Sequence, residues 1–386
     1  MIPYGRHEIT DEDILAVNRV LKSDFLVQGP EVESFEKQIA DYCNAKFAIA
    51  ANSATSALHL SYLALGVGPG DLVWTSPITF VATSNTALLC GADVDFVDID
   101  PETFNMSADL LAEKLVAVKA AGGRLPKVVT PVHMAGLSCD MKAIHALSKE
   151  YGFRIVEDAS HCIGASYMGK PVGNCDYSDI CVFSFHPVKI ITTGEGGLTT
   201  TNDAELAQRI GMLRSHGISR DEELMTHPSD GPWYYQQHLL GLNYRMTELQ
   251  GALGKSQLAR LDDIIAERHR LAERYDVFLA DMPVKLPFRP DGIRSSFHLY
   301  IIRVDTEKCT NSHRRIFEML REKGLGVQLH YIPVHTQPYY ERLGFKKGDF
   351  PLSEAYYSCA ISIPLFPTLG DERQNEVIAI LKEVLV

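Results

Sequence analysis

Lys189 occupies a position where a lysine side chain can do chemistry. The apolar run 179–183 predicts a buried strand, and residues 184–189 (Ser-Phe-His-Pro-Val-Lys) predict an irregular turn that continues into glycines at 194–197. An ammonium group beside a buried strand end is unfavourable unless it is paired or loses its proton. A lysine that loses its proton there can form an imine with a carbonyl compound. A solvated lysine is the usual alternative in a loop, and the apolar neighbourhood argues against it.

A carboxylate follows another predicted strand. Residues 153–156 are Phe-Arg-Ile-Val, and Glu157 and Asp158 come directly after them. A carboxylate at a buried strand end needs a cation or hydrogen-bond donors. Pyridoxal phosphate (PLP) requires such a carboxylate to keep its pyridine nitrogen protonated, so that the ring acts as an electron sink. Lys189 and Asp158 together therefore predict a PLP site.

Two other roles for Asp158 are a helix cap and a metal ligand. No further carboxylate or histidine stands at a spacing that completes a metal site, so no metal is expected. The eight cysteines contain no CxxC pair and predict reduced thiols, without disulfides or structural zinc.

The bulk composition excludes some classes of protein. The chain has 386 residues, of which 46% are hydrophobic, and this length predicts one large and one smaller domain. A net charge of −12 argues against a general nucleic-acid-binding protein, which needs a basic face. No apolar run approaches the length of a membrane span, and no secretory leader is recognisable. We expect a cytoplasmic protein without nucleic-acid or membrane partners.

Short apolar runs alternate with helical stretches from residue 46 onward. The expected strands are residues 47–50, 72–75, 94–98, 128–132, 154–157, 180–185 and 198–201, and the expected helices between the first five are 54–65, 80–89, 107–121 and 141–151. This alternation predicts an α/β fold with a largely parallel sheet of about seven strands between helices. Ligands of such sheets bind at the carboxyl ends of the strands, where Asp158 and Lys189 both stand.

The rest of the chain suggests further divisions. The expected parts are an N-terminal arm (1–12), a large domain (13–245), one long connecting helix (246–280) and a small α+β domain (281–386). The small domain should contain strands at 298–304 and 327–331, a helix at 312–323 and a closing helix from Gln374. An irregular stretch at 217–237 is long enough to predict a functional loop or an interface.

Other strand-end residues are ambiguous on local grounds. Residues 52–57 open a helix with small side chains, which fits a phosphate site as well as ordinary N-capping. Phe80 could stack on a flat ring or fill the core. His133, Gln328, His330 and His335 are each interpreted first as packing or surface residues.

Several motifs together resemble the DegT/DnrJ/EryC1/StrS family, the sugar-nucleotide aminotransferase branch of the fold-type-I PLP enzymes. The resemblance rests on residues 157–161 (Glu-Asp-Ala-Ser-His), 184–189, 194–197 (Gly-Glu-Gly-Gly) and 243–248 (Asn-Tyr-Arg-Met-Thr-Glu), with supporting matches at 28–30 and 331–335. A dehydratase branch of this family has histidine in place of the lysine. Lys189 therefore implies amino transfer.

The resemblance also implies a role for each matching residue. Lys189 would hold the cofactor and carry protons, and Asp158 would pair with its ring nitrogen. The remaining cofactor contacts would be Phe80 stacked on the ring, His161 beside it, the Ala54 and Thr55 amides and the Ser184 hydroxyl on the phosphate, and Asn243 on the phosphate of a partner subunit. The sugar-nucleotide pocket would include Leu26, Gln28, Gly29 and His330.

The implied reaction is a ping-pong transamination by a homodimer with shared active sites. L-Glutamate would convert the cofactor to pyridoxamine phosphate. The amino group would then pass to C4 of a UDP-linked 4-keto-6-deoxy-N-acetylhexosamine on the route to pseudaminic acid. The alternatives are another nucleotide sugar, such as a TDP-linked 3-keto or 4-keto sugar, and a non-catalytic regulatory protein that binds PLP.

Overall fold

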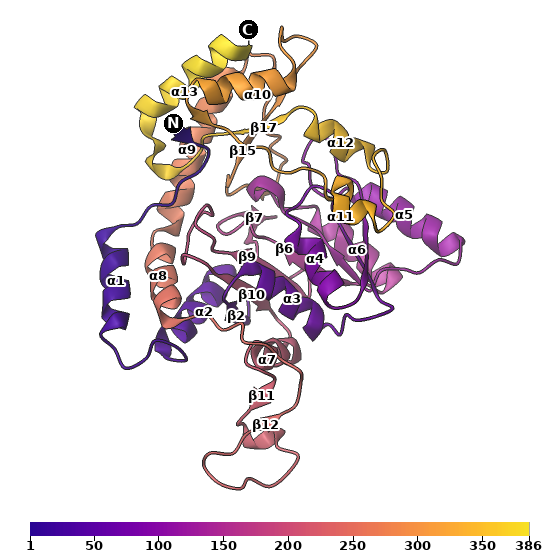
Figure 1. Ribbon diagram of the computed structural model, residues 1–386, viewed down its shortest axis with the longest axis vertical. Coiled ribbons are helices and arrows are strands. Elements are labelled where there is room, and N and C mark those ends of the chain that lie inside the picture. The colour runs from indigo at the N-terminus through magenta and orange to yellow at the C-terminus, as the bar shows by residue number, and fades with distance from the viewer. Residues whose placement is uncertain (386) are drawn as a thin grey trace.

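The larger part of the protein is built on a seven-stranded sheet. The computed structural model describes residues 1–385. From one edge to the other, the strands are β2 (Phe47–Ala51), β10 (Gly197–Thr201), β9 (Ile180–Ser184), β6 (Arg154–Asp158), β5 (Val128–Thr130), β3 (Leu72–Thr75) and β4 (Asp93–Phe96) (Figure 1). β10 runs antiparallel to both of its neighbours, and the other neighbouring pairs are parallel. The predicted α/β fold with a largely parallel sheet is confirmed.

Helices cover both faces of this sheet. One face is covered by α3 (Ala54–Ala64), α4 (Ala82–Leu89) and α7 (Ala204–Leu213), and the other by α2 (Pro30–Cys43), α5 (Ala108–Ala120) and α6 (Met141–Tyr151). Alternate residues of a strand therefore enter different cores. Val156 of β6 packs on the α3 side, whereas its neighbour Ile155 packs on the α5 and α6 side. Burial on both faces explains why these strands are continuous apolar runs in the sequence.

The smaller part is an antiparallel sheet covered by helices. It contains β13 (Val284–Lys285), β15 (Tyr300–Val304) and β17 (Ala360–Ile363), with α10 (His313–Glu322) and α13 (Gly370–Leu385) packed on it. The N-terminal β1 (Ile2–Pro3) pairs with β16 (Leu325–Gly326), so the start of the chain lies against this part. Shorter elements complete the chain: the sheet of β7 (Ser166–Tyr167), β8 (Lys170–Pro171) and β14 (Ile293–Arg294), and helices α11 (Pro338–Glu341) and α12 (Pro351–Tyr357).

The strand expected at residues 327–331 is wrong. After β16 the chain makes an isolated bridge between Gln328 and Ser362 and then leaves the sheet. His330 and Tyr331 both line the same cavity, whereas consecutive residues of a strand point to opposite faces. The apolar and aromatic character of this stretch reflects the cavity wall.

The single connecting helix expected at 246–280 is two helices, α8 (Glu248–Leu258) and α9 (Leu261–Leu279). Arg260 leaves the helical conformation between them, with φ −108° and ψ 7°. Its guanidinium donates a hydrogen bond to Asp13 of α1 (Asp11–Leu21), with 2.9 Å between Nη2 and Oδ2. α8 packs against α1 and α2, whereas the end of α9 enters the core of the smaller part.

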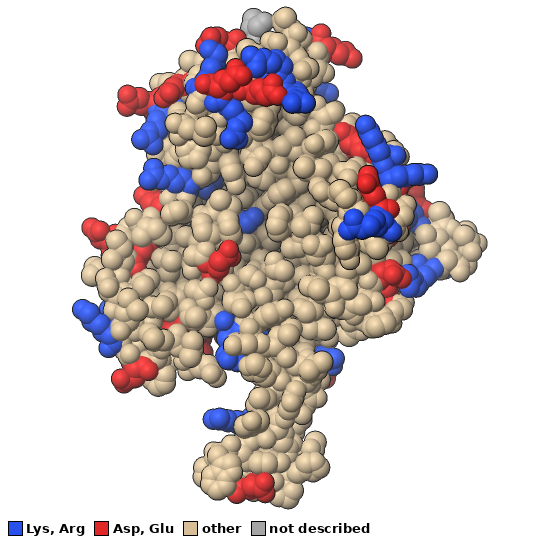
Figure 2. Space-filling view, viewed as in Figure 1, with Lys and Arg blue, Asp and Glu red and all other residues tan. Residues whose placement is uncertain are grey.

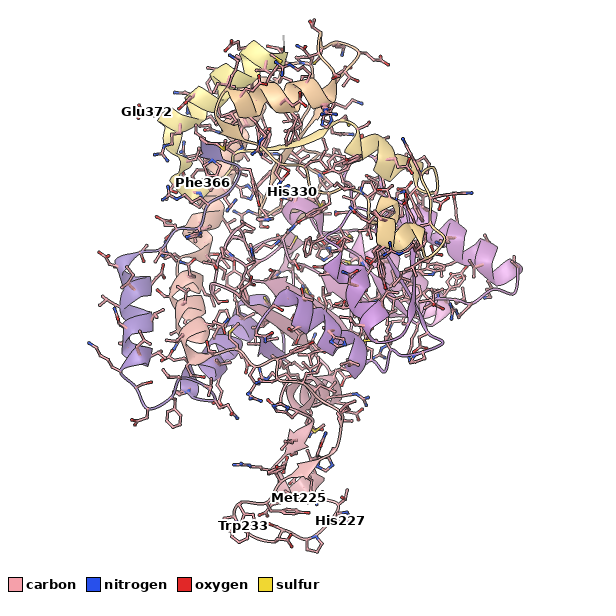
Figure 3. All side chains as sticks on the ribbon, viewed as in Figure 1. Met225, His227, Trp233, His330, Phe366 and Glu372 are labelled. Carbon is pink, nitrogen blue, oxygen red and sulfur yellow. The ribbon has the colours of Figure 1, made fainter. Side chains whose placement is uncertain are left out.

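An arm projects from the body between α7 and α8 (Figure 1). It contains the short strands β11 (Ile218–Ser219) and β12 (Gln236–Gln237), which pair with each other, and its far end carries Met225, His227 and Trp233 (Figure 3). Trp233 is 72% exposed and Leu240 is 89% exposed. Lysine, arginine and acidic residues gather over the smaller part, and few lie on the arm in this view (Figure 2). Within residues 1–385, no helix is long and apolar enough to cross a membrane.

Gly197 marks a close approach between the first residue of β10 and the start of α3. A Cβ placed there would lie 2.4 Å from the Ala54 nitrogen and from the Ser53 carbonyl. We predict that Gly197→Ala lowers the free energy of unfolding by about 1–3 kcal/mol, because backbone atoms must move apart. Denaturation in urea, followed by circular dichroism, measures the change.

Gly211→Ala is the matched control, because Gly211 lies within α7 and a Cβ there meets nothing within 4 Å. This variant should gain up to about 1 kcal/mol from helix propensity. An unchanged denaturation midpoint for Gly197→Ala would contradict the close approach.

Candidate active site

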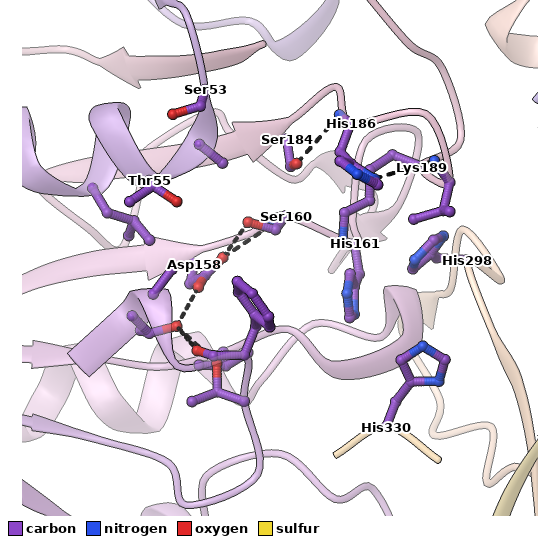
Figure 4. A pocket seen from close by; sticks show the side chains of 18 of the residues that line it. Ser53, Thr55, Asp158, Ser160, His161, Ser184, His186, Lys189, His298 and His330 are labelled. Atoms are coloured by element: carbon purple, nitrogen blue, oxygen red, sulfur yellow. Dashed lines mark hydrogen bonds between the residues drawn. The ribbon is translucent and has the colours of Figure 1, made fainter. Parts of the chain in front are cut away.

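A cavity of about 540 Å³ lies at the carboxyl ends of the parallel strands. It is closed on one side by residues of the smaller part, including His298, His330 and Tyr331. Of the predicted site residues, eight lie in its wall: Ala54, Thr55, Phe80, Asp158, His161, Ser184, Lys189 and His330. The folded chain thus brings together residues that are far apart in the sequence (Figure 4).

Asp158 is buried at the end of β6 and is fixed by three hydrogen bonds. Oδ2 accepts from the Thr83 hydroxyl at 2.7 Å, and Oδ1 accepts from the Ser160 amide at 3.1 Å and the Ser160 hydroxyl at 2.6 Å. These donors compensate for the water that the carboxylate loses on burial. The side chain therefore has a fixed position on the cavity floor.

Lys189 lies in the turn between β9 and β10 and lines the same cavity. Burial lowers the pKa of its ammonium group from 10.5 to about 8, and the Asp158 carboxylate opposes this only in part. An appreciable fraction of this lysine is therefore a neutral amine near neutral pH, as nucleophilic attack on a carbonyl requires.

The start of α3 lies at one end of the cavity, in a geometry that can bind an anion. The Ser53 hydroxyl caps the helix by accepting from the Ser56 amide at 3.1 Å. The first amides of a helix have no intrahelical acceptor, and those of Ala54 and Thr55 lie at the cavity wall with the Ser184 hydroxyl. Gly197 permits this arrangement, because any larger residue there would displace the helix start.

Phe80 is 59% exposed, so it does not fill the core. Its ring lies 6.2 Å from the Tyr331 ring and lines the cavity. An exposed aromatic face beside a buried carboxylate can cover a flat ligand ring.

Three neutral histidines line the other end of the cavity, namely His161, His298 and His330. Nδ1 of His161 accepts from the Ala135 amide at 3.3 Å, so Nε2 carries the proton and donates to the Tyr331 hydroxyl at 3.2 Å. Burial and the nearby Lys189 lower the pKa of His330 to about 3, and burial lowers the pKa of His161 well below its usual value. This wall therefore offers neutral donors and acceptors.

Several wall residues were not predicted. Ser160 could have been found, because a serine two residues after an aspartate often bonds back to it. Thr83 lies one turn after Phe80. Its hydrogen bond to Asp158 depends on where β6 ends, which the local sequence around Thr83 does not show. Tyr4, His298 and Tyr331 come from distant segments, and no local pattern in the sequence assigns them to this cavity.

Four predicted site residues lie outside this cavity: Leu26, Gln28, Gly29 and Asn243. The first three belong to the turn between α1 and α2, where the Glu248 carboxylate accepts from the Gly29 amide at 3.0 Å. Asn243 forms an isolated antiparallel β-bridge with Ser215 at the base of the arm. Their assigned roles remain predictions.

His133 and His335 are packing residues, as their first interpretation stated. His133 is buried, with Nε2 2.6 Å from Glu157, and His335 is buried, with Nε2 3.0 Å from Glu354. Gln328 is exposed. None of the three lines the cavity.

Comparison with known proteins assigns the family. Residues 7–382 match the model of the DegT/DnrJ/EryC1/StrS aminotransferase family. The chain belongs to this family. The expected membership is confirmed, and the protein is an aminotransferase of a PLP-dependent family whose members act on sugars.

Individual relatives match this chain over nearly their whole length. The aminotransferase is 39% identical over 387 residues to the spore coat polysaccharide biosynthesis protein SpsC of Bacillus subtilis (strain 168), covering 100% of this chain and 97% of SpsC. It is similar to Helicobacter pylori PseC, an aminotransferase involved in the biosynthesis of pseudoaminic acid, with a TM-score of 0.90, 31% identity and coverage of 100% and 99%. Streptococcus pneumoniae Spr1654 in its PLP form gives a TM-score of 0.88 at 28% identity, with 100% of each chain covered.

The low pKa of Lys189 leads to a prediction for the apoprotein. Below about pH 8 the side chain is mainly an ammonium ion, and above it mainly a free amine. We predict that the rate of PLP attachment rises with pH and reaches half of its maximum near pH 8, not near 10.5. Stopped-flow absorbance across this range measures the rate.

Lys189→Ala is the control and should not show the shift in PLP absorbance that accompanies covalent attachment to a lysine. A wild-type rate that climbs steadily to pH 10 or beyond would mean that this amine is solvated as an ordinary lysine is.

Proposed function

We propose that this aminotransferase moves an amino group from L-glutamate to C4 of a UDP-linked 4-keto-6-deoxy-N-acetylhexosamine. This is the UDP-4-amino-4,6-dideoxy-N-acetyl-β-L-altrosamine transaminase reaction of pseudaminic acid precursor synthesis. The observation that carries the proposal is the position of Lys189 and Asp158 in one cavity, with a helix start at its far end.

The cavity residues fit PLP. The helix start at Ala54 and Thr55, with the Ser184 hydroxyl, would hold the phosphate, the exposed face of Phe80 would cover the ring, and Asp158 would meet the ring nitrogen. When bound, PLP supplies an aldehyde for covalent attachment and a protonated ring that withdraws electrons from the reacting carbon.

Lys189 is the residue suited to move protons. Its pKa near 8 lets the free amine accept a proton from the substrate carbon and return it from the ammonium form. Thr83 and Ser160 hold the Asp158 carboxylate in place. In that position it would favour a protonated ring nitrogen when PLP is bound.

Two observations bear on the sugar. The similarity to PseC along the whole chain supports a pseudaminic acid precursor. SpsC, at 39% identity, is a spore coat polysaccharide biosynthesis protein, which keeps open the second candidate, another nucleotide-linked keto sugar. A non-catalytic PLP-binding protein is the third candidate, and it would hold the cofactor without turnover.

A homodimer with shared sites is part of this proposal. Lys189 is the only lysine or arginine among the described residues that line the cavity, whereas a sugar nucleotide carries a diphosphate. Further hydrogen-bond donors for the diphosphate must therefore come from outside this cavity. The family resemblance gives Asn243 a role at the cofactor phosphate of the partner subunit. The exposed apolar residues of the 25–27 turn and of the arm, Phe25, Leu26, Val27, Trp233 and Leu240, support an association that covers these surfaces.

A two-step absorbance experiment tests the reaction. L-Glutamate should convert the yellow lysine-bound cofactor to the pyridoxamine form, because Lys189 can carry the proton. After the amino acid is removed, the UDP-linked 4-keto-6-deoxy-N-acetylhexosamine should restore the yellow band and yield an amino sugar.

Lys189→Ala is the control and should show neither change. Recovery with a TDP-linked keto sugar alone would replace the proposed sugar with the second candidate. A yellow protein that L-glutamate leaves unchanged would favour the regulatory candidate.

Mixed dimers test the shared site. Lys189→Ala and Asn243→Ala homodimers should both be inactive or strongly impaired. If Asn243 serves the partner's site, a mixed dimer has one intact site, and a random mixture regains about a quarter of the wild-type sites. Co-expression of the two variants, followed by activity assay of the mixture, gives the result. No recovery on mixing would place Asn243 in its own subunit's site.

A further inference from the structure

His298 is a cavity residue to which neither the family motifs nor the sequence pattern assigns a role. It is 4% exposed, and its ring centre lies 4.4 Å from that of His161. In Figure 4 it lies beside Lys189, on the side away from the helix start that carries Ser53 and Thr55. Its Nδ1 atom is buried and has no hydrogen-bond partner among the described residues.

The segment that carries His298 is held unusually firmly. Arg268 of α9 is 1% exposed, and its Nη1 donates to the carbonyl oxygens of Phe297 at 3.1 Å and His298 at 3.3 Å. The Ser296 hydroxyl donates to the carbonyl of His161 at 2.8 Å. Burying an arginine to bind carbonyl oxygens is costly, so its effect is to fix the position of this backbone.

The backbone itself is strained at the preceding residue. Phe297 has φ 47°, a left-handed conformation that residues with a Cβ rarely adopt. Gly136 packs so closely that a Cβ there would lie 2.5 Å from the Ser296 hydroxyl and 3.0 Å from the His298 nitrogen. Strain that persists under so many constraints is typical of residues positioned for a ligand.

The protonation of His298 follows from its surroundings. Burial, together with the nearby His161 and Lys189, lowers the pKa of its imidazole well below the usual value, so the ring is neutral at physiological pH. A neutral imidazole has one N–H group and one lone pair. An unpaired buried acceptor is better tolerated than an unpaired donor, which places the lone pair on Nδ1 and the proton on Nε2.

Simple packing does not account for this side chain. A buried polar atom without a partner is destabilising, and an apolar residue would fill the same space without that cost. Because Nδ1 is enclosed by protein, the edge that carries Nε2 is the part of the ring available to the cavity. The chain thus presents a fixed, neutral N–H donor next to the reactive lysine.

We propose that His298 determines substrate orientation by donating a hydrogen bond from Nε2 to the oxygen on the carbon next to the reacting carbon. This proposal rests on the proposed function. Both substrates of a ping-pong transamination occupy one site in turn, and both carry such an oxygen. It belongs to the carboxylate of the amino acid and to the neighbouring hydroxyl of the keto sugar.

The composition of the cavity wall explains why a neutral donor is used. Its described residues include no arginine, so the amino acid carboxylate has no guanidinium partner from this subunit's cavity. A permanently charged residue would bind the carboxylate well but would leave an unpaired buried charge when the uncharged sugar hydroxyl replaced it. A neutral imidazole serves both substrates.

Three variants of His298 separate the proposal from a packing role. His298→Phe keeps the ring shape without a donor, His298→Gln places an amide N–H near the position of Nε2, and His298→Asn places one near the position of Nδ1. The PLP-loaded variants are compared in single-turnover assays of each half-reaction, with L-glutamate and with the keto sugar. Melting temperature and the cofactor absorbance band are recorded for each.

Loss of the hydrogen bond should slow both half-reactions of His298→Phe by about 10- to 100-fold, with the cofactor band retained. His298→Gln should recover most of this loss, and His298→Asn should not. If His298→Phe does not fold, the Gln and Asn pair decides, since the proposal requires Gln to be faster in both half-reactions.

Equal rates for the Gln and Asn variants would overturn the proposal, as would a His298→Phe variant with wild-type rates. A loss confined to one substrate would overturn the shared role. In each of these cases the wild type still transaminates, so the proposed function stands. A wild type that fails both half-reactions would instead remove the proposed function, and this inference with it.

Discussion

The site depends on a buried carboxylate and a partly buried amine placed together at the carboxyl ends of neighbouring strands. Asp158 remains fixed there because Thr83 and Ser160 donate three hydrogen bonds to it. Lys189 has no such set of fixed partners. Burial instead lowers its pKa from 10.5 to about 8. The same removal of water thus yields one side chain with a fixed position and one able to gain and lose a proton.

The antiparallel strand makes this arrangement possible. The first residue of β10, Gly197, pairs with the last residues of β9 and β2, Ser184 and Ala51. β10 therefore begins at the side of the sheet where the parallel strands end. The turn that carries Lys189 is therefore tethered at both ends beside the cavity. The same strand start lies against the beginning of α3, so one close contact between backbones positions both the Lys189 turn and the first residues of α3.

The sequence predicts the parts of the structure whose causes are local. Strands buried on both faces are apolar runs, and Asp158, Lys189 and the opening of α3 follow them directly.

Residues whose placement depends on distant segments are not predicted, such as Tyr4 and His298. The break between α8 and α9 was also missed, because it involves an ion pair from Arg260 to Asp13 near the other end of the chain. Tyr331 lies in a stretch with the composition of a strand, and only the folded cavity shows why it leaves the sheet.

The division of charge in the cavity suggests how two unlike substrates share it. The charged lining residues are Asp158, Lys189 and Glu195, whereas the wall from the smaller part includes His298 and His330, which burial holds neutral, and Tyr331. Neutral donors bind carboxylates less strongly than an arginine would, but they leave no buried charge unpaired when the other substrate enters. Weak, well-positioned contacts therefore suit the proposed ping-pong reaction, in which each product leaves before the next substrate binds. The strain at Phe297 and the buried Arg268 are consistent with this requirement, because a neutral hydrogen bond discriminates between orientations only if its donor does not move.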